Sequence, residues 1–250
     1  EQHGTDFGRN PSGTGAFKFA EWRSNEAVVV EANSEHWDGA PKLEAAVFRP
    51  ITDANTRTAE MLAGGIDLMV EVPPVSLSEF QGNSYTVHEQ AGPHVWFLIL
   101  NAKEGPFADV RVRQAANYAI NKEAIVNDVL EGTAAVAAGP TPPAFAWAYN
   151  ESLEPYPYDP DKARALLAEA GAEGAELTFY VTEGGSGMLD PVAMGTAIQA
   201  DLKAVGLNVK IETYEWNTFL GEVNPGLEGK ADMAEMAWMT NDPDTLPFLA

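Results

Sequence analysis

The sequence WMTNDPDTL places two aspartates, Asp242 and Asp244, directly after an aromatic and apolar stretch. A carboxylate beside aromatic walls offers a ligand ammonium group both a counter-charge and a dry surface. Trp238, Met239 and Thr240 precede the aspartates, so we take these five residues as candidate ligand-binding residues. The two aspartates could equally be turn and N-cap residues in front of a following helix.

Further candidates lie in or after other predicted strands. Open α/β sheets bind ligands beyond the carboxyl ends of their strands, which here selects the loops after residues 182, 214 and 238. The first of these loops, EGGSG, contributes Glu183 and Gly184, and its backbone N–H groups could approach an anion. Trp216 starts the segment after residue 214, and Trp96 lies in an apolar strand. An aromatic side chain in either place can equally belong to the core.

Catalysis and metal binding receive little support from the residue types present. None of the four histidines, at positions 3, 36, 88 and 94, shows ligand spacing with another on one element. A G-x-S-x-G nucleophile elbow is absent, and so is cysteine. Two aspartates fall short of the six to eight oxygens that calcium takes. We expect no catalytic residue, no metal site and no cofactor, and keep a cation-dependent hydrolase using the DPD loop as a remote alternative.

The charge of the chain narrows the classes of partner. The 250 residues carry 37 acidic and 15 basic side chains, a formal net charge of −22. Such an excess of negative charge excludes nucleic acid and anionic membrane surfaces as expected partners. The charge is typical of a soluble protein. The alternative is that its electric field attracts a basic ligand. No apolar run reaches the roughly 18 residues of a membrane span.

The first hundred residues predict strands with little helix. Alternating and β-branched stretches predict strands over most of residues 15–50, and Asp53 predicts the N-cap of a helix that ends near Leu62 before Gly64 and Gly65. The sequence IDLMVEV predicts a short strand, PPVSLSEFQ a helix, and YTVHEQ another strand. The apolar run HVWFLILN predicts a strand that is buried on both faces.

The remainder of the chain predicts alternating helices and strands. Asp109 and Asn121 are expected to cap two consecutive helices between residues 109 and 130. A loop rich in Pro and Ala follows, and its aromatic residues Phe145, Trp147 and Tyr149 suggest that it packs. Helix, strand (ELTFYVT), helix (189–205), strand (NVKIETY), helix and strand (ADMAEMAWM) then follow from residue 159. This alternation predicts βαβ units and a mostly parallel sheet.

Six segments in one order resemble a known family. They are PSGTGAFKFAEW, the WDGAP turn with the helix and strand after it, FADVRVRQAANYAINKEAIVNDVL, YDPDKARALLAEAGA, AIQADLKAVGLNVKIETYEW and AWMTNDPDTL. The set resembles the extracytoplasmic solute-binding proteins of ABC importers, family 5, the peptide/nickel-binding type. No single motif is diagnostic, but their agreement in order extends over nearly the whole chain.

The resemblance implies a periplasmic binding protein-like α/β fold of type II, the large cluster with an extra domain. Mixed sheets flanked by helices would form two lobes, with residues 1–101 in lobe I up to the crossing strand and residues 102–250 in the first part of lobe II. It covers the middle half of such proteins, so we expect a fragment that binds ligand weakly by itself. Strands left without neighbours can pair with another chain, and a dimer of the fragment stays open.

The function implied is the capture of a peptide or similar small solute between two lobes, for delivery to an ABC permease from the periplasm. A periplasmic sensor or chemoreceptor protein with the same fold is the alternative. In peptide-binding members an aspartate of the last loop pairs with the ligand amine, which suggests Asp242 first and Asp244 second. Dipeptide binders carry an arginine in the loop that begins at Glu183, whereas this chain has no Arg or Lys between Arg164 and Lys203. A longer peptide, or a ligand without a carboxylate there, is therefore favoured.

Overall fold

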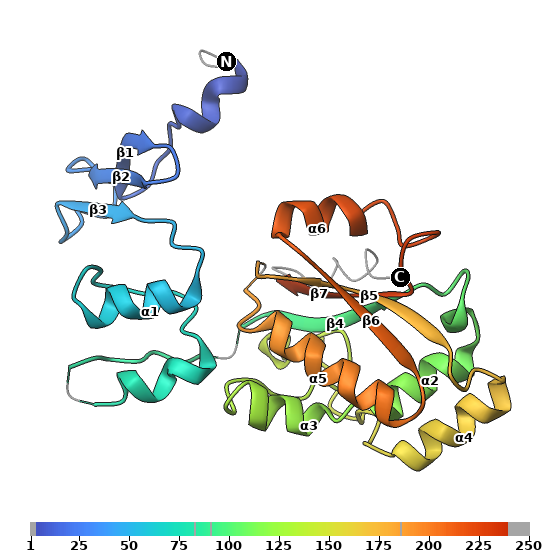
Figure 1. Ribbon diagram of the computed structural model, residues 1–250. Helices are drawn as coiled ribbons and strands as arrows, with labels where there is room; N and C mark the ends of the chain where they lie inside the picture. Colours follow the sequence, from blue (N-terminus) through green and yellow to red (C-terminus); the bar gives the residue numbers. More distant parts are fainter. Residues whose placement is uncertain (1–3, 83, 91, 186, 240–250) are drawn as a thin grey trace. The chain divides into compact units, whose positions relative to one another are not determined.

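The computed structural model describes residues 4–82, 84–90, 92–185 and 187–239. The chain divides into two compact units, Glu1–Met69 and Val70–Ala250, which we call unit 1 and unit 2. Figure 1 gives the labels of the helices and strands. The fold is mixed α/β, as the sequence predicts.

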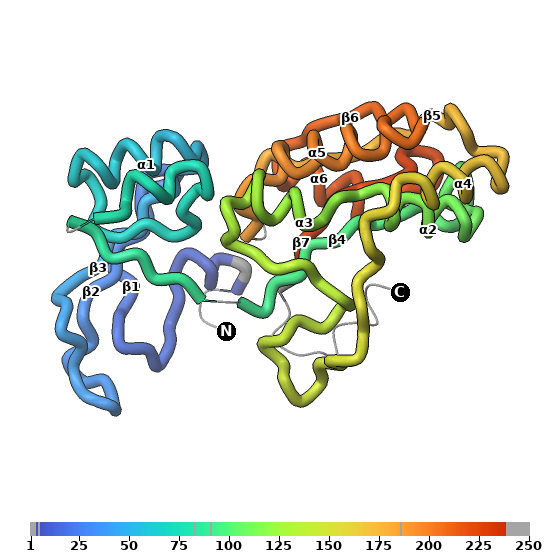
Figure 2. Tube along the Cα trace, turned by 90° about the horizontal axis from the view of Figure 1, so that it is seen from below, coloured from blue at the N-terminus to red at the C-terminus, as the bar shows by residue number. Residues whose placement is uncertain are grey.

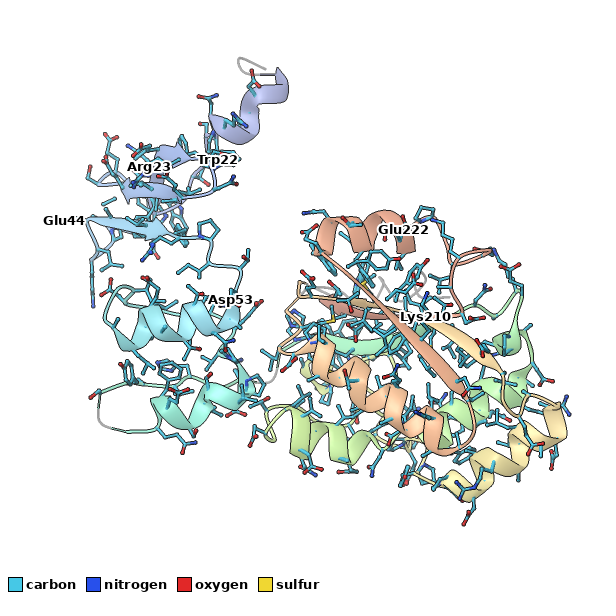
Figure 3. The ribbon with its side chains drawn as sticks, viewed as in Figure 1. Trp22, Arg23, Glu44, Asp53, Lys210 and Glu222 are labelled. Atoms are coloured by element: carbon cyan, nitrogen blue, oxygen red, sulfur yellow. The ribbon has the colours of Figure 1, made fainter. Side chains whose placement is uncertain are left out.

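Unit 1 combines a small antiparallel sheet with one α-helix. Strands β1 (Phe17–Arg23), β2 (Ala27–Ala32) and β3 (Ala45–Phe48) pair in that order, and a bulge interrupts the first pairing near Phe19 and Glu21. A short 3₁₀ helix, Gly4–Arg9, precedes them. Figure 3 labels Trp22 and Arg23 on β1, and Glu44 just before β3. The strands predicted within residues 15–50 are thus confirmed.

The helix of unit 1, α1 (Ala54–Leu62), begins as its sequence predicts. Asp53, labelled in Figure 3, accepts hydrogen bonds from the backbone N–H and the hydroxyl of Thr56, at 2.8 and 2.6 Å. These bonds lower the pKa of the Asp53 carboxyl. Beyond the helix, Gly64 takes a φ of +73°, a conformation that glycine adopts without strain.

Unit 2 is built around a four-stranded mixed sheet with the order β4-β7-β5-β6. Its strands are β4 (His94–Leu100), β5 (Glu176–Thr182), β6 (Asn208–Tyr214) and β7 (Met233–Met239). The neighbours β5 and β6 are parallel, β5 and β7 are parallel, and β4 runs antiparallel to β7. The mostly parallel sheet is confirmed, with one antiparallel strand at its edge.

Helices cover both faces of this sheet (Figure 1). The helices are α2 (Val110–Ala119), α3 (Lys122–Ala124) with a π-helical turn at Ile125–Val129, α4 (Pro160–Ala170), α5 (Pro191–Ala204) and α6 (Trp216–Val223). The predicted caps Asp109 and Asn121 accept backbone N–H groups at the starts of α2 and α3. Figure 2 shows α2 and α4 side by side.

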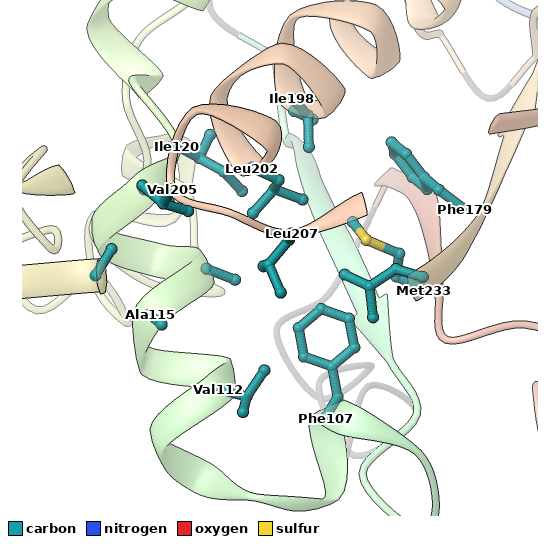
Figure 4. Close-up of a cluster of buried hydrophobic side chains, with 14 of the residues drawn as sticks. Phe107, Val112, Ala115, Ile120, Phe179, Ile198, Leu202, Val205, Leu207 and Met233 are labelled. Atoms are coloured by element: carbon teal, nitrogen blue, oxygen red, sulfur yellow. The ribbon is translucent and has the colours of Figure 1, made fainter. Parts of the chain in front are cut away.

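Two clusters of buried side chains, one on each side of the sheet, hold unit 2 together. The larger lies between the sheet and α2, α4 and α5, and Figure 4 shows part of it, including Phe107, Phe179 and Leu207. The smaller lies under α6 around Phe219 and Tyr180. We call them the α5-side core and the α6-side core. Strand alternation assigns neighbouring residues of each strand to opposite cores.

The helix predicted for PPVSLSEFQ is confirmed, and it is a 3₁₀ helix, Pro74–Phe80. Other expectations about local structure are wrong. IDLMVEV and YTVHEQ form no strand in the described residues, because neither run finds a strand to pair with. Strand β4 is half-buried, with Val95 as its buried residue, because it is the outermost strand of its sheet. In the Pro- and Ala-rich loop Trp147 is 77% exposed, although Phe145 and Tyr149 are half-buried.

The division between the units falls at Met69 and Val70, ahead of the lobe boundary expected near Asn101. That expectation concerned the lobes of a longer protein, so residues 1–101 and 102–250 stay a prediction about its lobes. In the described part of the chain, no helix is both long and apolar enough to cross a membrane.

Candidate functional site

The carboxyl ends of three parallel strands meet at one edge of the unit 2 sheet. Strand β5 ends at Thr182, β6 at Tyr214 and β7 at Met239. The loops predicted to follow residues 182 and 214 therefore start side by side, and the backbone N–H of Glu183 donates to the carbonyl of Tyr214 at 2.9 Å. Since β4 is antiparallel, its first residue, His94, lies at the same edge opposite Met239. We call this edge the carboxyl edge.

The loop at residues 183–187 starts with a tight turn closed by Thr182. The Thr182 hydroxyl donates to the carbonyl of Gly184 at 2.7 Å, and the Gly184 N–H donates back to that hydroxyl at 3.3 Å. Thr182 is fully buried, whereas Glu183 is exposed. Of the two loop residues predicted to bind ligand, Glu183 therefore faces solvent and Gly184 is half-buried.

Trp216 lies directly against this loop. A Cβ added to Gly185, whose φ is +112°, would come within 2.3 Å of the Trp216 ring. The indole also stacks on Phe219, with ring centroids 5.9 Å apart and planes 15° apart. Glycine at position 185 thus lets the backbone approach the indole face, and the structure brings this predicted aromatic together with the predicted loop.

The other two tryptophans predicted to bind ligand lie on opposite faces of the sheet. Trp238, 37% exposed, lies on the same face of β7 as Ala234 and Met236, so it belongs to the α6 side, as does Trp216. Trp96 packs against the α5-side core. The structure therefore does not bring Trp96 together with Trp216, and the core role that the sequence left open for Trp96 accounts for its position. Solute contact by Trp96 stays a prediction.

Several predicted site residues cannot be placed. Thr240, Asp242 and Asp244 lie outside the described residues, and for Met239 only the backbone pairing with His94 is described. The described residues contain no group of three or more His, Asp or Glu side chains placed to hold a metal ion.

Sequence reasoning missed two residues of the carboxyl edge. His94, to which the spacing of the histidines assigns no role, lies against the loop, since a Cβ on Gly187 would lie 2.7 Å from its Nε2 atom. Glu235 lies in β7 and is only 5% exposed, and burial raises the pKa of its carboxyl to about 8. The negative charge of Asp190 adds to that rise. A lone Glu between apolar residues in ADMAEMAWM was the available signal for Glu235.

Two concavities lie away from the carboxyl edge. One of about 270 Å³ opens at the opposite edge of the unit 2 sheet, lined by Asn101, Glu104, Gly105 and residues 229–232. Another, of about 390 Å³, lies in unit 1 beside Arg23 and Arg49. At the carboxyl edge, the strand ends and the loops that start there are the features that indicate a site.

The sequence profile of the bacterial extracellular solute-binding proteins, family 5 middle, matches residues 1–250. The chain belongs to this family. Its family 5 relatives include heme-binding protein A of Haemophilus influenzae, 33% identical over 243 residues, which cover 96% of this chain and 44% of the relative. The dipeptide-binding protein of Escherichia coli K12 is 33% identical over 245 residues, covering 96% and 45%. The chain spans about half the length of the curated relatives it matches.

Solved structures of family 5 proteins agree with the fold. The periplasmic binding protein DppA of Helicobacter pylori, in complex with the peptide STSA, matches with a TM-score of 0.83 at 32% identity, over 95% of this chain and 45% of that one. NikZ of Campylobacter jejuni, in complex with Ni(L-His), matches with a TM-score of 0.81 at 27% identity, over 97% and 50%. The two relatives are named for heme and for dipeptides, and the two solved structures hold a peptide and Ni(L-His), so membership alone does not select a ligand.

Proposed function

We propose that this chain forms part of the solute-binding component of an ABC importer, and that it captures a peptide or a similar small solute for a membrane permease. Binding would hold the solute against aromatic walls, and lobe closure would present the loaded protein to the permease. The periplasm is the compartment that fits this role. We assign no catalytic step to the chain, since the relatives it matches are named as binding proteins.

One observation carries the proposal. The likeness to the H. pylori protein, which was solved with a bound peptide, extends over 95% of this chain. The carboxyl edge adds a physical reason, because the place where loops follow parallel strands is where open α/β sheets bind ligands. There Trp216 supplies an apolar wall half-exposed to solvent, beside a loop whose Gly185 lets the backbone approach the indole.

The charges of the chain bear on the kind of solute. The loop at residues 183–187 has no basic residue, and none occurs between Arg164 and Lys203. A small zwitterionic dipeptide would therefore lack a cationic partner for its carboxylate in this loop. We propose a longer peptide, or another solute that carries an amine and no carboxylate at this place.

Native mass spectrometry on the protein purified gently from its source tests the proposed function. We expect a non-covalent adduct of peptide size that disappears on denaturation, because tight periplasmic binders retain their solute. Fragmentation of the released adduct would identify it. A protein that carries no adduct and takes up none from a peptide digest would contradict the proposal.

The aspartates of the last loop provide a matched pair of variants for the binding site. In the importer protein Asp242→Asn should weaken binding of an alanine tetrapeptide by roughly 1.5–3 kcal/mol, since a charged hydrogen bond to the ammonium is lost. Asp244→Asn should have the smaller effect. Isothermal titration calorimetry measures both, and acetylation of the tetrapeptide amine should remove the difference between wild type and Asp242→Asn. Equal affinity of all three proteins would remove Asp242 from the site.

A further inference from the structure

The seam between β5 and β7 is short and is completed by two acidic side chains. The strand pairing joins Phe179 with Met233 and Tyr180 with Ala234. Just before β7, the backbone N–H of Asp232 also donates to the carbonyl of Thr178 at 3.0 Å. At the end away from the site, Asp232 accepts a hydrogen bond from the Thr178 N–H at 2.8 Å. At the carboxyl edge, Glu235 Oε1 accepts one from the Thr182 N–H at 3.1 Å. Carboxyl groups thus take the place of backbone acceptors where the two strands part.

Glu235 occupies an apolar place in the sheet. It lies opposite Leu98 on the side of the α5-side core, where its neighbours in β4 and β7 are uncharged apart from His94. The loop after β5 brings Glu183, and the start of α5 brings Asp190. The other ionisable residues of α5, Asp201 and Lys203, lie in its last turn. Among the described residues, the N–H of Thr182 supplies the one hydrogen bond that reaches the Glu235 carboxyl.

A short series of contacts connects Glu235 to the candidate site. Thr182, which Glu235 holds, closes the turn at Gly184 through its own hydroxyl. The next residues of the loop bring Gly185 against Trp216 and Gly187 against His94. The Glu235 carboxyl is therefore hydrogen-bonded directly to Thr182, the residue that closes the turn of the loop.

We propose that Glu235 is a positioning residue of the solute site, a proton-dependent brace that holds the end of β5 and residues 183–185 of the following loop in place. The role in solute binding rests on the proposed function; the brace does not. When protonated, the carboxyl accepts the Thr182 N–H without burying a charge. When ionised in the closed arrangement, it carries a buried charge of the same sign as Asp190, and this charge favours an open loop that admits water.

The pH range of the effect follows from the two environments of Glu235. Its pKa is about 8 when the loop is closed and falls toward the ordinary value of 4.5 when water reaches it. The open loop therefore binds fewer protons, and the opening equilibrium constant should rise as pH rises between these values, by up to about tenfold per unit. Above about pH 8 both arrangements are ionised, and the constant should level off.

Amide hydrogen exchange of the intact 250-residue chain between pH 5 and 9, corrected for intrinsic exchange, tests the brace without any solute. In the wild type, we expect the opening constants measured at Thr182 and Gly184 to rise with pH and to level off above about pH 8. In Glu235→Gln, which keeps a carbonyl acceptor but cannot ionise, the curve should be flat. Asp232→Asn changes the carboxyl at the other end of the seam and should leave the wild-type curve intact.

Carbon-13 NMR of the Glu235 carboxyl in the wild type gives a second measurement that needs no variant, and its midpoint should coincide with the pH at which loop exchange levels off. A midpoint near 4.5, or equal pH dependence in wild type and Glu235→Gln, would overturn the brace. A rise in exchange shared by Thr178 would mean general unfolding and would overturn it as well. If exchange in the loop after β5 depends on the ionisation of Glu235, but the protein takes up no peptide, the result would support the brace and contradict the proposed function.

Discussion

Units 1 and 2 are built from the same kinds of element but bury very different amounts of apolar surface. Among the described residues, Ala27 is the one buried hydrophobic side chain of unit 1. Val47 and Phe48, in the strand β3, are 55% and 61% exposed. In unit 2, by contrast, both faces of the sheet are covered, and side chains such as Phe179 and Phe219 are completely buried.

In unit 1, polar contacts join elements that have little apolar surface buried between them. Arg49 hydrogen-bonds to Glu60 of α1 and to the carbonyl of Gly65, both at 2.9 Å, and so joins the end of β3 to the last turn of α1 and to the turn after it. Arg57 donates to the carbonyls of Ile51 and Thr52. Exposed ion pairs contribute about 0–1 kcal/mol each, so such contacts fix geometry more than they stabilise. Figure 3 labels a comparable exposed residue of unit 2, Glu222, which pairs with Lys230.

Regular strands and a helix thus form in unit 1 although it has almost no apolar core. Caps, turns and strand pairing shape unit 1, since they depend on near neighbours in sequence. The free energy that holds a domain together comes mainly from apolar burial, about 25 cal/mol per Å², and this is concentrated in unit 2. Local order and stability therefore have different sources in this chain.

Separating the units should produce the largest effect. Residues 70–250 expressed alone should unfold cooperatively in urea, because the two cores of unit 2 lie within this range. Residues 1–69 alone should show no cooperative transition, because their apolar side chains remain in water. Circular dichroism during urea titration measures both. Dispersed amide NMR signals from residues 1–69 would show that polar contacts suffice, and would break the comparison.

Truncating one side chain in each unit compares how much apolar burial stabilises units 1 and 2. Phe179→Ala removes a fully buried ring from the α5-side core and should lower the free energy of unfolding by about 3–5 kcal/mol. Val47→Ala removes a side chain that is 55% exposed and should change it by no more than about 0.5 kcal/mol. Urea unfolding of the 250-residue chain measures both values, and a cost at Val47 like that at Phe179 would mean that unit 1 has a core of its own.

Local signals explain what could be predicted from the sequence. Asp53, Asp109 and Asn121 begin helices as expected because a cap needs only the next few N–H groups. The strand predictions for β5, β6 and β7 are confirmed because each of these apolar runs has a partner strand in the structure. IDLMVEV has the same composition as a strand but no partner, and a single sequence carries no record of which strands pair.

The candidate site was predictable only where it depends on strand ends. The loop at Glu183 and the position of Trp216 followed from the βαβ alternation, which fixes where parallel strands end. His94 entered the site because β4 runs antiparallel, and Glu235 because β5 and β7 part beside it. Both facts concern residues more than 50 positions apart along the chain, which no local pattern encodes.

A smaller loss of stability than that of Phe179→Ala is expected at the contact between Gly185 and Trp216 at the carboxyl edge. Gly185→Ala should lower the free energy of unfolding by about 1–3 kcal/mol, because alanine strains a backbone with a φ of +112°. The new methyl group would also meet the indole, so Trp216 must move, and its indole N–H signal should shift in NMR spectra. Gly184→Ala is the matched control, since its φ lies outside the left-handed region and its Cβ would meet nothing within 4 Å. If both variants leave the Trp216 signal unchanged, the loop does not rest on this aromatic wall, and the carboxyl edge loses the contact that unites it.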